Sequence, residues 1–190
     1  EIGRRIPLTI WSGTADGYRL RLVEHDPAFA RDGGLYGTAD GDYPDNALRF
    51  TILGRAALEA MRAEARPVDI LHGHDWQAGP AILSLRTRYA FDPMLARVAT
   101  VMTCHNLAYH GWTPRDRAWA LDLPDSVGDL YGVDLLRETV RIADMVNTVS
   151  PTYARESLTP DYGAGLDEAL RERGDRYTGI LNGIDQGLWD

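Results

Sequence analysis

Histidine and carboxylate side chains gather in one short stretch, V-D-I-L-H-G-H-D-W-Q-A over residues 68–78. Two His separated by one residue share a face of a strand and can bind a metal ion. A metal-dependent hydrolase, however, needs further ligands. A carboxylate beside an indole suits a sugar, because hydroxyls bond carboxylates and C–H faces pack on aromatic rings. We therefore expect no metal, interpret His72 as a hydrogen-bonded core histidine, and predict that Asp75 and Trp76 bind a sugar.

A second group, C-H-N-L-A-Y-H-G, occupies residues 104–111. A Cys–His pair can supply a thiol nucleophile, but adjacent residues of a strand point to opposite faces. We predict that Cys104 is a small buried apolar residue and that His105 bonds either a ligand hydroxyl or nearby backbone. Ser150 has no G-x-S-x-G around it and is better placed to cap the helix that Pro151 opens.

The elements around these groups follow from apolar periodicity. We predict strands over 7–12, 18–23, 68–72, 98–103, 144–149 and 177–181, and helices over 47–65, 79–89, 135–143, 152–158 and 166–173. A turn over 13–17 makes the first two strands a hairpin, 25–45 is a long loop, and 109–134 is irregular. The later strands alternate with helices, which favours a parallel sheet with helices on both faces. A ligand would then bind at the carboxyl ends of the strands.

Composition narrows the possible partners. Charged residues make up 25% and the net charge is −8, so neither a nucleic acid nor a membrane is an expected partner. Cys104 is the only cysteine, which fits a reducing, cytoplasmic location. All 20 basic residues are Arg, and neither G-x-G-x-x-G nor a phosphate-loop motif occurs. We therefore expect no cofactor and no complete nucleotide site in this chain.

Five motifs, taken in order, resemble those of the glycogen and starch synthases. They are F-A-R-D-G-G-L-Y-G, D-I-L-H-G-H-D-W-Q-A-G, T-V-M-T-C-H-N-L-A-Y-H-G, A-D-M-V-N-T-V-S-P-T-Y-A-R-E and G-I-L-N-G-I-D-x-x-x-W, between residues 29 and 189. The resemblance implies an α/β fold with a Rossmann-like parallel sheet and flanking helices, the N-terminal half of a GT-B glycosyltransferase. Residues 1–190 would form the acceptor-side domain, truncated at both ends, without the C-terminal nucleotide-binding domain.

The same resemblance implies the reaction and the residues that serve it. The enzyme would transfer glucose from ADP-glucose to the non-reducing end of an α-1,4-glucan with retention, and this chain alone would be inactive. His105 would be catalytic through contact with the transferred glucose. The substrate-binding residues would be Tyr36, Asp75, Trp76, Gln77, Asn106 and Asn182. Gln77 stands where relatives often carry His, and 112–133 diverges from the family's usual pattern.

Two other functions are compatible with the residues. A glucan-binding module without catalysis would keep Asp75 and Trp76 but would need neither His105 nor Asn182. A metal-dependent hydrolase would use His72, His74 and His105 as ligands.

Overall fold

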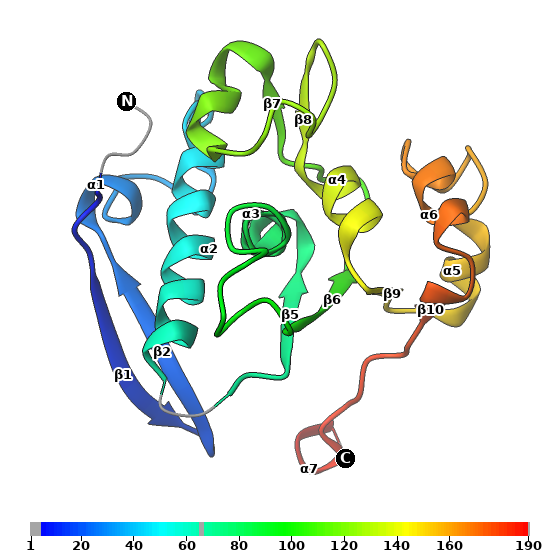
Figure 1. Cartoon of the computed structure of the whole chain (residues 1–190). Helices are drawn as coiled ribbons and strands as arrows, with labels where there is room; N and C mark the ends of the chain where they lie inside the picture. Colours follow the sequence, from blue (N-terminus) through cyan, green and yellow to red (C-terminus); the bar gives the residue numbers. More distant parts are fainter. Residues whose placement is uncertain (1–4, 65–66, 190) are drawn as a thin grey trace.

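A computed structural model describes residues 5–64 and 67–189, and these contain a four-stranded parallel sheet (Figure 1). Its strands lie in the order β10-β9-β6-β5, with β5 at Ile70–His74, β6 at Ala99–Cys104, β9 at Met145–Thr148 and β10 at Tyr177–Gly179. Each strand is added on the same side of the one before it. Right-handed crossovers therefore bring the connecting helices to one face of the sheet.

The helix layer consists of α3 (Asp75–Arg86), α4 (Leu135–Ile142) and α6 (Asp167–Arg173), which lie on one side of the sheet in Figure 1. The prediction of helices on both faces is wrong for the described part of the chain. The cause is the strand order, since alternation of strands and helices gives a second helical layer only where the order reverses.

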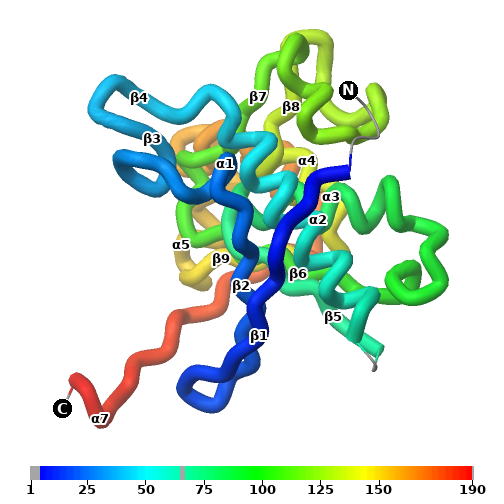
Figure 2. The backbone as a smooth tube through the Cα atoms, turned by 90° about the vertical axis from the view of Figure 1, so that its left-hand side faces the viewer, coloured from blue at the N-terminus to red at the C-terminus, as the bar shows by residue number. Residues whose placement is uncertain are grey.

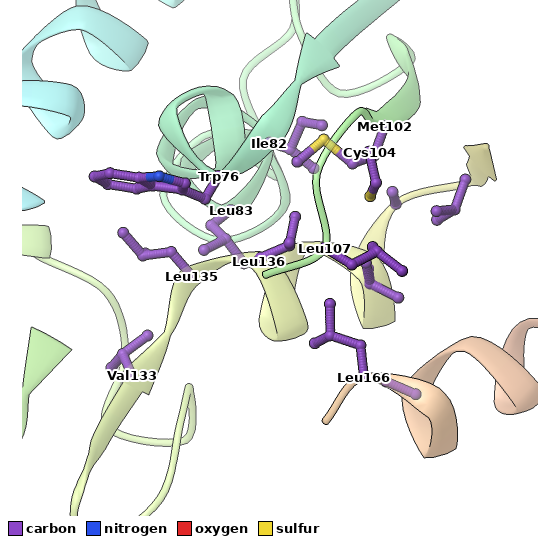
Figure 3. Packing of buried hydrophobic residues seen from close by; sticks show 14 of the residues in the cluster. Trp76, Ile82, Leu83, Met102, Cys104, Leu107, Val133, Leu135, Leu136 and Leu166 are labelled. Atoms are coloured by element: carbon purple, nitrogen blue, oxygen red, sulfur yellow. The ribbon is translucent and has the colours of Figure 1, made fainter. Parts of the chain in front are cut away.

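The two faces of the strands carry different side chains. Leu71, Met102 and Cys104 face the helices and join the main core, which Figure 3 shows between α3, α4 and the sheet. His72 and His74 alternate with them and are exposed on the opposite face. The expectation that Cys104 is a buried apolar residue is confirmed, and burial raises the pKa of its thiol to about 12. The interpretation of His72 as a core residue is wrong.

The N-terminal hairpin is present, with β1 at Thr9–Ala15 and β2 at Tyr18–Glu24. The predicted turn over 13–17 is too long, because Ala15 pairs with Tyr18 and only Asp16 and Gly17 turn the chain. Both have positive φ, +50° and +81°, as a two-residue Asp-Gly turn requires.

The strand β5 runs into α3 without a loop, and this junction differs most from the prediction. The strand ends two residues later than expected and the helix begins four residues earlier, at Asp75. Asp75 makes the abrupt turn with φ +55°, a left-handed conformation that Asp tolerates better than most residues. Asp75, Trp76 and Gln77 therefore occupy the first turn of a helix.

The other elements follow the predicted order. The long loop contains α1 (Asp26–Phe29), β3 (Gly37–Thr38) and β4 (Gly41–Asp42), and leads into α2 (Asn46–Ala63). Ala65, where α2 was predicted to end, lies outside the described residues. Ser150 caps α5 (Pro151–Glu156) by accepting a hydrogen bond from the Tyr153 N–H at 3.1 Å, as expected. The C-terminal elements are η2 (Gly174–Arg176) and α7 (Gln186–Trp189).

The irregular region forms a small lobe at the top of Figure 1, near α2 and α4. It consists of β7 (Trp112–Pro114), the 3₁₀ helix η1 (Arg115–Leu121) and β8 (Gly132–Asp134), with β7 and β8 antiparallel. Among the helices of the described residues, none has the length and apolar character needed to cross a membrane.

Candidate functional site

A cleft of about 1150 Å³ opens beside the junction of β5 and α3. One wall is formed by Tyr36 and by residues 42–48, which lead from the end of β4 into α2. The other lies in the segment 106–120, which includes β7 and most of η1. Both walls lie in the upper part of Figure 2. The first turn of α3 closes the cleft between them. Five of the predicted substrate-binding residues line it: Tyr36, Asp75, Trp76, Gln77 and Asn106.

Asp75 joins the two polar groups that the sequence singled out. Its Oδ1 accepts hydrogen bonds from the backbone N–H of His105 at 2.7 Å and of Asn106 at 3.2 Å. Asn106 in turn accepts from the Ala108 N–H at 2.9 Å through its side-chain oxygen. Hydrogen bonds to an ionised acceptor are about twice as strong as neutral ones. Asp75 therefore fixes the start of the segment that forms one wall of the cleft.

Three imidazoles stack on the open face of the sheet beside the cleft. The ring centroids of His72 and His74 are 4.4 Å apart, and those of His74 and His105 are 5.2 Å apart. His74 Nδ1 and His105 Nε2 are hydrogen-bonded at 3.0 Å. Burial, followed by the charges of His72 and His105, lowers the pKa of His74. This environment therefore favours the neutral form of His74.

The far end of the stack is fixed by a hydrogen-bond chain. The Thr103 hydroxyl donates to Asn147 Oδ1 at 2.8 Å, so it accepts from His72 Nε2 at 2.7 Å. No three His, Cys, Asp or Glu side chains in residues 5–64 and 67–189 are arranged to hold a metal ion. The ring nitrogens are used in hydrogen bonds instead, His74 with His105 and His72 with Thr103.

Trp76 lines the cleft but is only 8% exposed. Its ring packs edge-on against Phe50, with centroids 4.9 Å apart and an interplanar angle of 80°. On the other side lies Gly111, where an added Cβ would stand 2.1 Å from Trp76 Cε3, and whose φ is +66°. Figure 3 shows the indole at the edge of the core cluster. Trp76 thus shapes the floor of the cleft and offers little ring surface to a sugar.

Tyr36 and Gln77 bring the first wall to the floor of the cleft. Gln77 Nε2 donates to the Tyr36 hydroxyl at 2.8 Å, across 41 residues of sequence. The Asn46 amide also donates to the Tyr36 carbonyl at 2.8 Å, which fixes the loop to the start of α2. A phenol and a primary amide can both donate and accept, so this pair suits a ligand with many hydroxyls.

Three aromatic residues of the cleft were missed by the sequence reasoning: Tyr109, Trp112 and Trp119. They belong to the region predicted only as irregular. A signal was present, because three large aromatic residues within eleven positions of a segment without strand or helix periodicity are hard to bury. Their exposure in a cleft makes them better candidates for stacking on a sugar than Trp76.

The two other predicted residues lie outside the lining of the cleft. His105 adjoins it through the bonds to Asp75 and His74. Asn182 is exposed in the segment that follows β10. The strands β10 and β5 form opposite edges of the sheet. Figure 2 shows this segment leading away from the body of the molecule toward the C terminus. The structure therefore does not bring Asn182 to the cleft.

Comparison with known proteins identifies the family. The family model described as "Starch synthase catalytic domain" matches residues 1–172. This chain belongs to that family. It is 41% identical over 187 residues to a glycogen synthase of Syntrophotalea carbinolica, covering 95% of this chain and 38% of the relative. It is 44% identical over 176 residues to glycogen synthase 2 of Geobacter sulfurreducens, covering 89% and 36%.

A solved structure gives the same result for the fold. The catalytic domain of starch synthase IV from Arabidopsis thaliana, bound to ADP and acarbose, superimposes with a TM-score of 0.84 at 30% identity. The match covers 96% of this chain and 38% of that one. The predicted fold, an α/β parallel sheet with flanking helices as in the N-terminal half of a GT-B glycosyltransferase, is confirmed. The chain spans less than two fifths of the length of these family members.

A buried ion pair at the second wall of the cleft predicts a pH dependence. His110 Nδ1 donates to Asp134 Oδ2 at 2.6 Å, and Asp134 also caps α4 by accepting from the Arg137 N–H at 2.9 Å. The hydrogen bond to Asp134 raises the pKa of His110 above its usual value of about 6.5. The pair therefore stabilises the fold fully below about pH 6.5, and this stabilisation is lost as the pH rises through the raised pKa.

Urea unfolding across this pH range measures the effect. We expect the free energy of unfolding to fall as the pH rises above about 6.5. Asp134→Asn keeps a helix-capping side chain but removes the charge, so it should flatten the dependence. An equal pH slope in the wild type and the variant would contradict the assignment.

Proposed function

We propose that this chain forms the acceptor-side domain of a glycogen or starch synthase. The enzyme transfers glucose from ADP-glucose to the non-reducing end of an α-1,4-glucan, with retention, and works in the cytoplasm. The observation that carries the proposal is the cleft at the β5–α3 junction, in a chain of the starch synthase family. Relatives named glycogen synthase and a similar starch synthase structure bound to ADP and acarbose support it.

The cleft has the chemistry that a glucan acceptor needs. Asp75, Gln77 and Asn106 offer hydrogen-bonding groups at the floor, next to exposed aromatic rings. Sugars bind where hydroxyl partners and apolar ring faces occur together. In this proposal His105, whose backbone the Asp75 carboxylate holds beside the cleft, contacts the transferred glucose. Tyr36 and Asn182 contact the sugar donor. The nucleotide would be bound mainly by parts of the relatives that this chain does not span.

The proposal is tested on the polypeptide encoded by the complete reading frame. With glycogen as acceptor, we expect glucose transfer from ADP-glucose in preference to UDP-glucose, and no transfer by residues 1–190 alone. His105→Ala should lose transfer while retaining glucan affinity, as measured by affinity electrophoresis. Transfer by the isolated chain at the rate of the complete polypeptide would overturn the domain assignment.

A glucan-binding module without catalysis remains the alternative, because the aromatic cleft alone would serve it. That function predicts glucan binding with no transfer from either donor, and no effect of His105→Ala. Transfer by the complete polypeptide that depends on His105 would exclude it.

A further inference from the structure

The cleft is divided into a polar part and an aromatic part. The polar part comprises Tyr36, Asp75, Gln77 and Asn106, near the carboxyl end of β5. The aromatic part is carried by the lobe, where Trp112 is 56% exposed and Trp119 is 59% exposed. Neighbouring exposed apolar side chains with polar residues beside them often mark a ligand-binding groove.

The size of the cleft exceeds the need of one sugar unit. Sites for single small ligands usually measure about 300–1,000 Å³. This cleft measures about 1150 Å³, and its second wall continues from Asn106 to Ala120. It has room for an oligomer whose end lies at the polar part and whose body passes over the aromatic part.

The lobe that carries the two tryptophans is firmly attached. Asp122 follows η1 and receives hydrogen bonds from Arg55 at 2.8 Å and from Arg88 at 2.9 Å. Arg115 donates to the Asp129 carbonyl at 2.9 Å within the lobe. Arg117 donates to the Pro44 carbonyl at 3.4 Å and so links the two walls. A binding surface held in place before the ligand arrives loses less entropy on binding.

We propose that Trp112 and Trp119 form a second glucan subsite, separate from the polar part and used only by longer chains. The subsite rests on the proposed function, because its ligand is the acceptor glucan. The tryptophans would stack on sugar units away from the reacting end, while the polar part holds that end. The lobe would thereby set the preference for long over short acceptors.

Isothermal titration of the complete polypeptide with maltoheptaose and with maltose tests the proposal. Trp119→Ala and Trp112→Ala should each weaken maltoheptaose binding by about 3- to 10-fold, the usual value of one aromatic stacking contact. Maltose binding should not change. Trp119→Tyr keeps an aromatic ring and should recover most of the loss.

Trp11→Ala is the matched control, because Trp11 is also 59% exposed but lies on β1, outside the cleft lining. It should leave both affinities unchanged. Equal weakening of maltose and maltoheptaose by Trp119→Ala, or no weakening of either, would overturn the second subsite while leaving the proposed function intact. If the wild type bound neither sugar, the proposed function itself would fail.

Discussion

Replacing Asp75 with alanine is expected to lower kcat of the complete polypeptide by about 100-fold or more. The carboxylate holds the backbone N–H groups of His105 and Asn106, so its loss releases the segment that carries both side chains. A displacement of about 1 Å at a reacting centre can cost about 100-fold in rate. A steady-state assay with ADP-glucose and glycogen, with circular dichroism to confirm folding, measures the effect.

Two further variants separate the causes. Asp75 has φ +55°, a conformation that costs alanine about 1–2 kcal/mol, whereas Asp75→Gly removes the same carboxylate without that strain. Asp75→Asn tolerates the conformation and keeps an acceptor oxygen, although not the charge. We expect kcat to be highest in the wild type, lower in Asp75→Asn, and lowest and about equal in Asp75→Gly and Asp75→Ala. If Asp75→Gly kept wild-type kcat, the carboxylate would have no positioning role.

Replacing Arg49 with methionine is expected to lower the free energy of unfolding by about 3–5 kcal/mol, because three acceptor oxygens lose their donor. Arg49 is 3% exposed and donates to the carbonyls of Ala28 at 2.6 Å and Leu35 at 3.0 Å, and to Asn46 Oδ1 at 2.5 Å. Removing the guanidinium leaves these acceptors without a hydrogen-bond donor, which costs about 1–3 kcal/mol of stability for each buried group.

The same guanidinium lies over the rings of Tyr43 and Phe50, at 4.9 Å and 5.5 Å from their centroids. Burial lowers its pKa, yet arginine still remains charged at neutral pH. Urea unfolding of Arg49→Met measures the loss. Arg62→Met, on the same helix but exposed, is the control and should change little. Equal destabilisation by the two variants would contradict the role of Arg49.

The sequence predicted the order of the elements because apolar periodicity reports burial directly. It failed at the β5–α3 junction, where the left-handed backbone of Asp75 replaces a loop that local patterns would require. It also assigned the helices to two faces, since alternation alone does not encode strand order.

The candidate site was predicted in part for the same reason. The carboxyl ends of the parallel strands β5 and β6 lie at the same edge of the sheet, so the sequence could predict that Asp75, His105 and Asn106 lie close together. The sequence does not show how deeply each tryptophan is buried. It therefore led to the prediction that Trp76 contacts a sugar, although the exposed Trp112 and Trp119 are better placed to do so. Packing against Phe50 and Gly111 depends on tertiary structure and leaves no local pattern.

The way in which the cleft is closed has a consequence for the order of folding. Gln77 joins the floor to the first wall at Tyr36, and Arg117 joins the second wall to the first at Pro44. These pairs are 41 and 73 residues apart, whereas the hairpin turns on two residues. Distant pairs form later, because the chain entropy lost in closing a long loop precedes the contacts that compensate for it. We expect the cleft to be completed last. A glucan would then bind only the finished fold and draw late intermediates toward it by mass action.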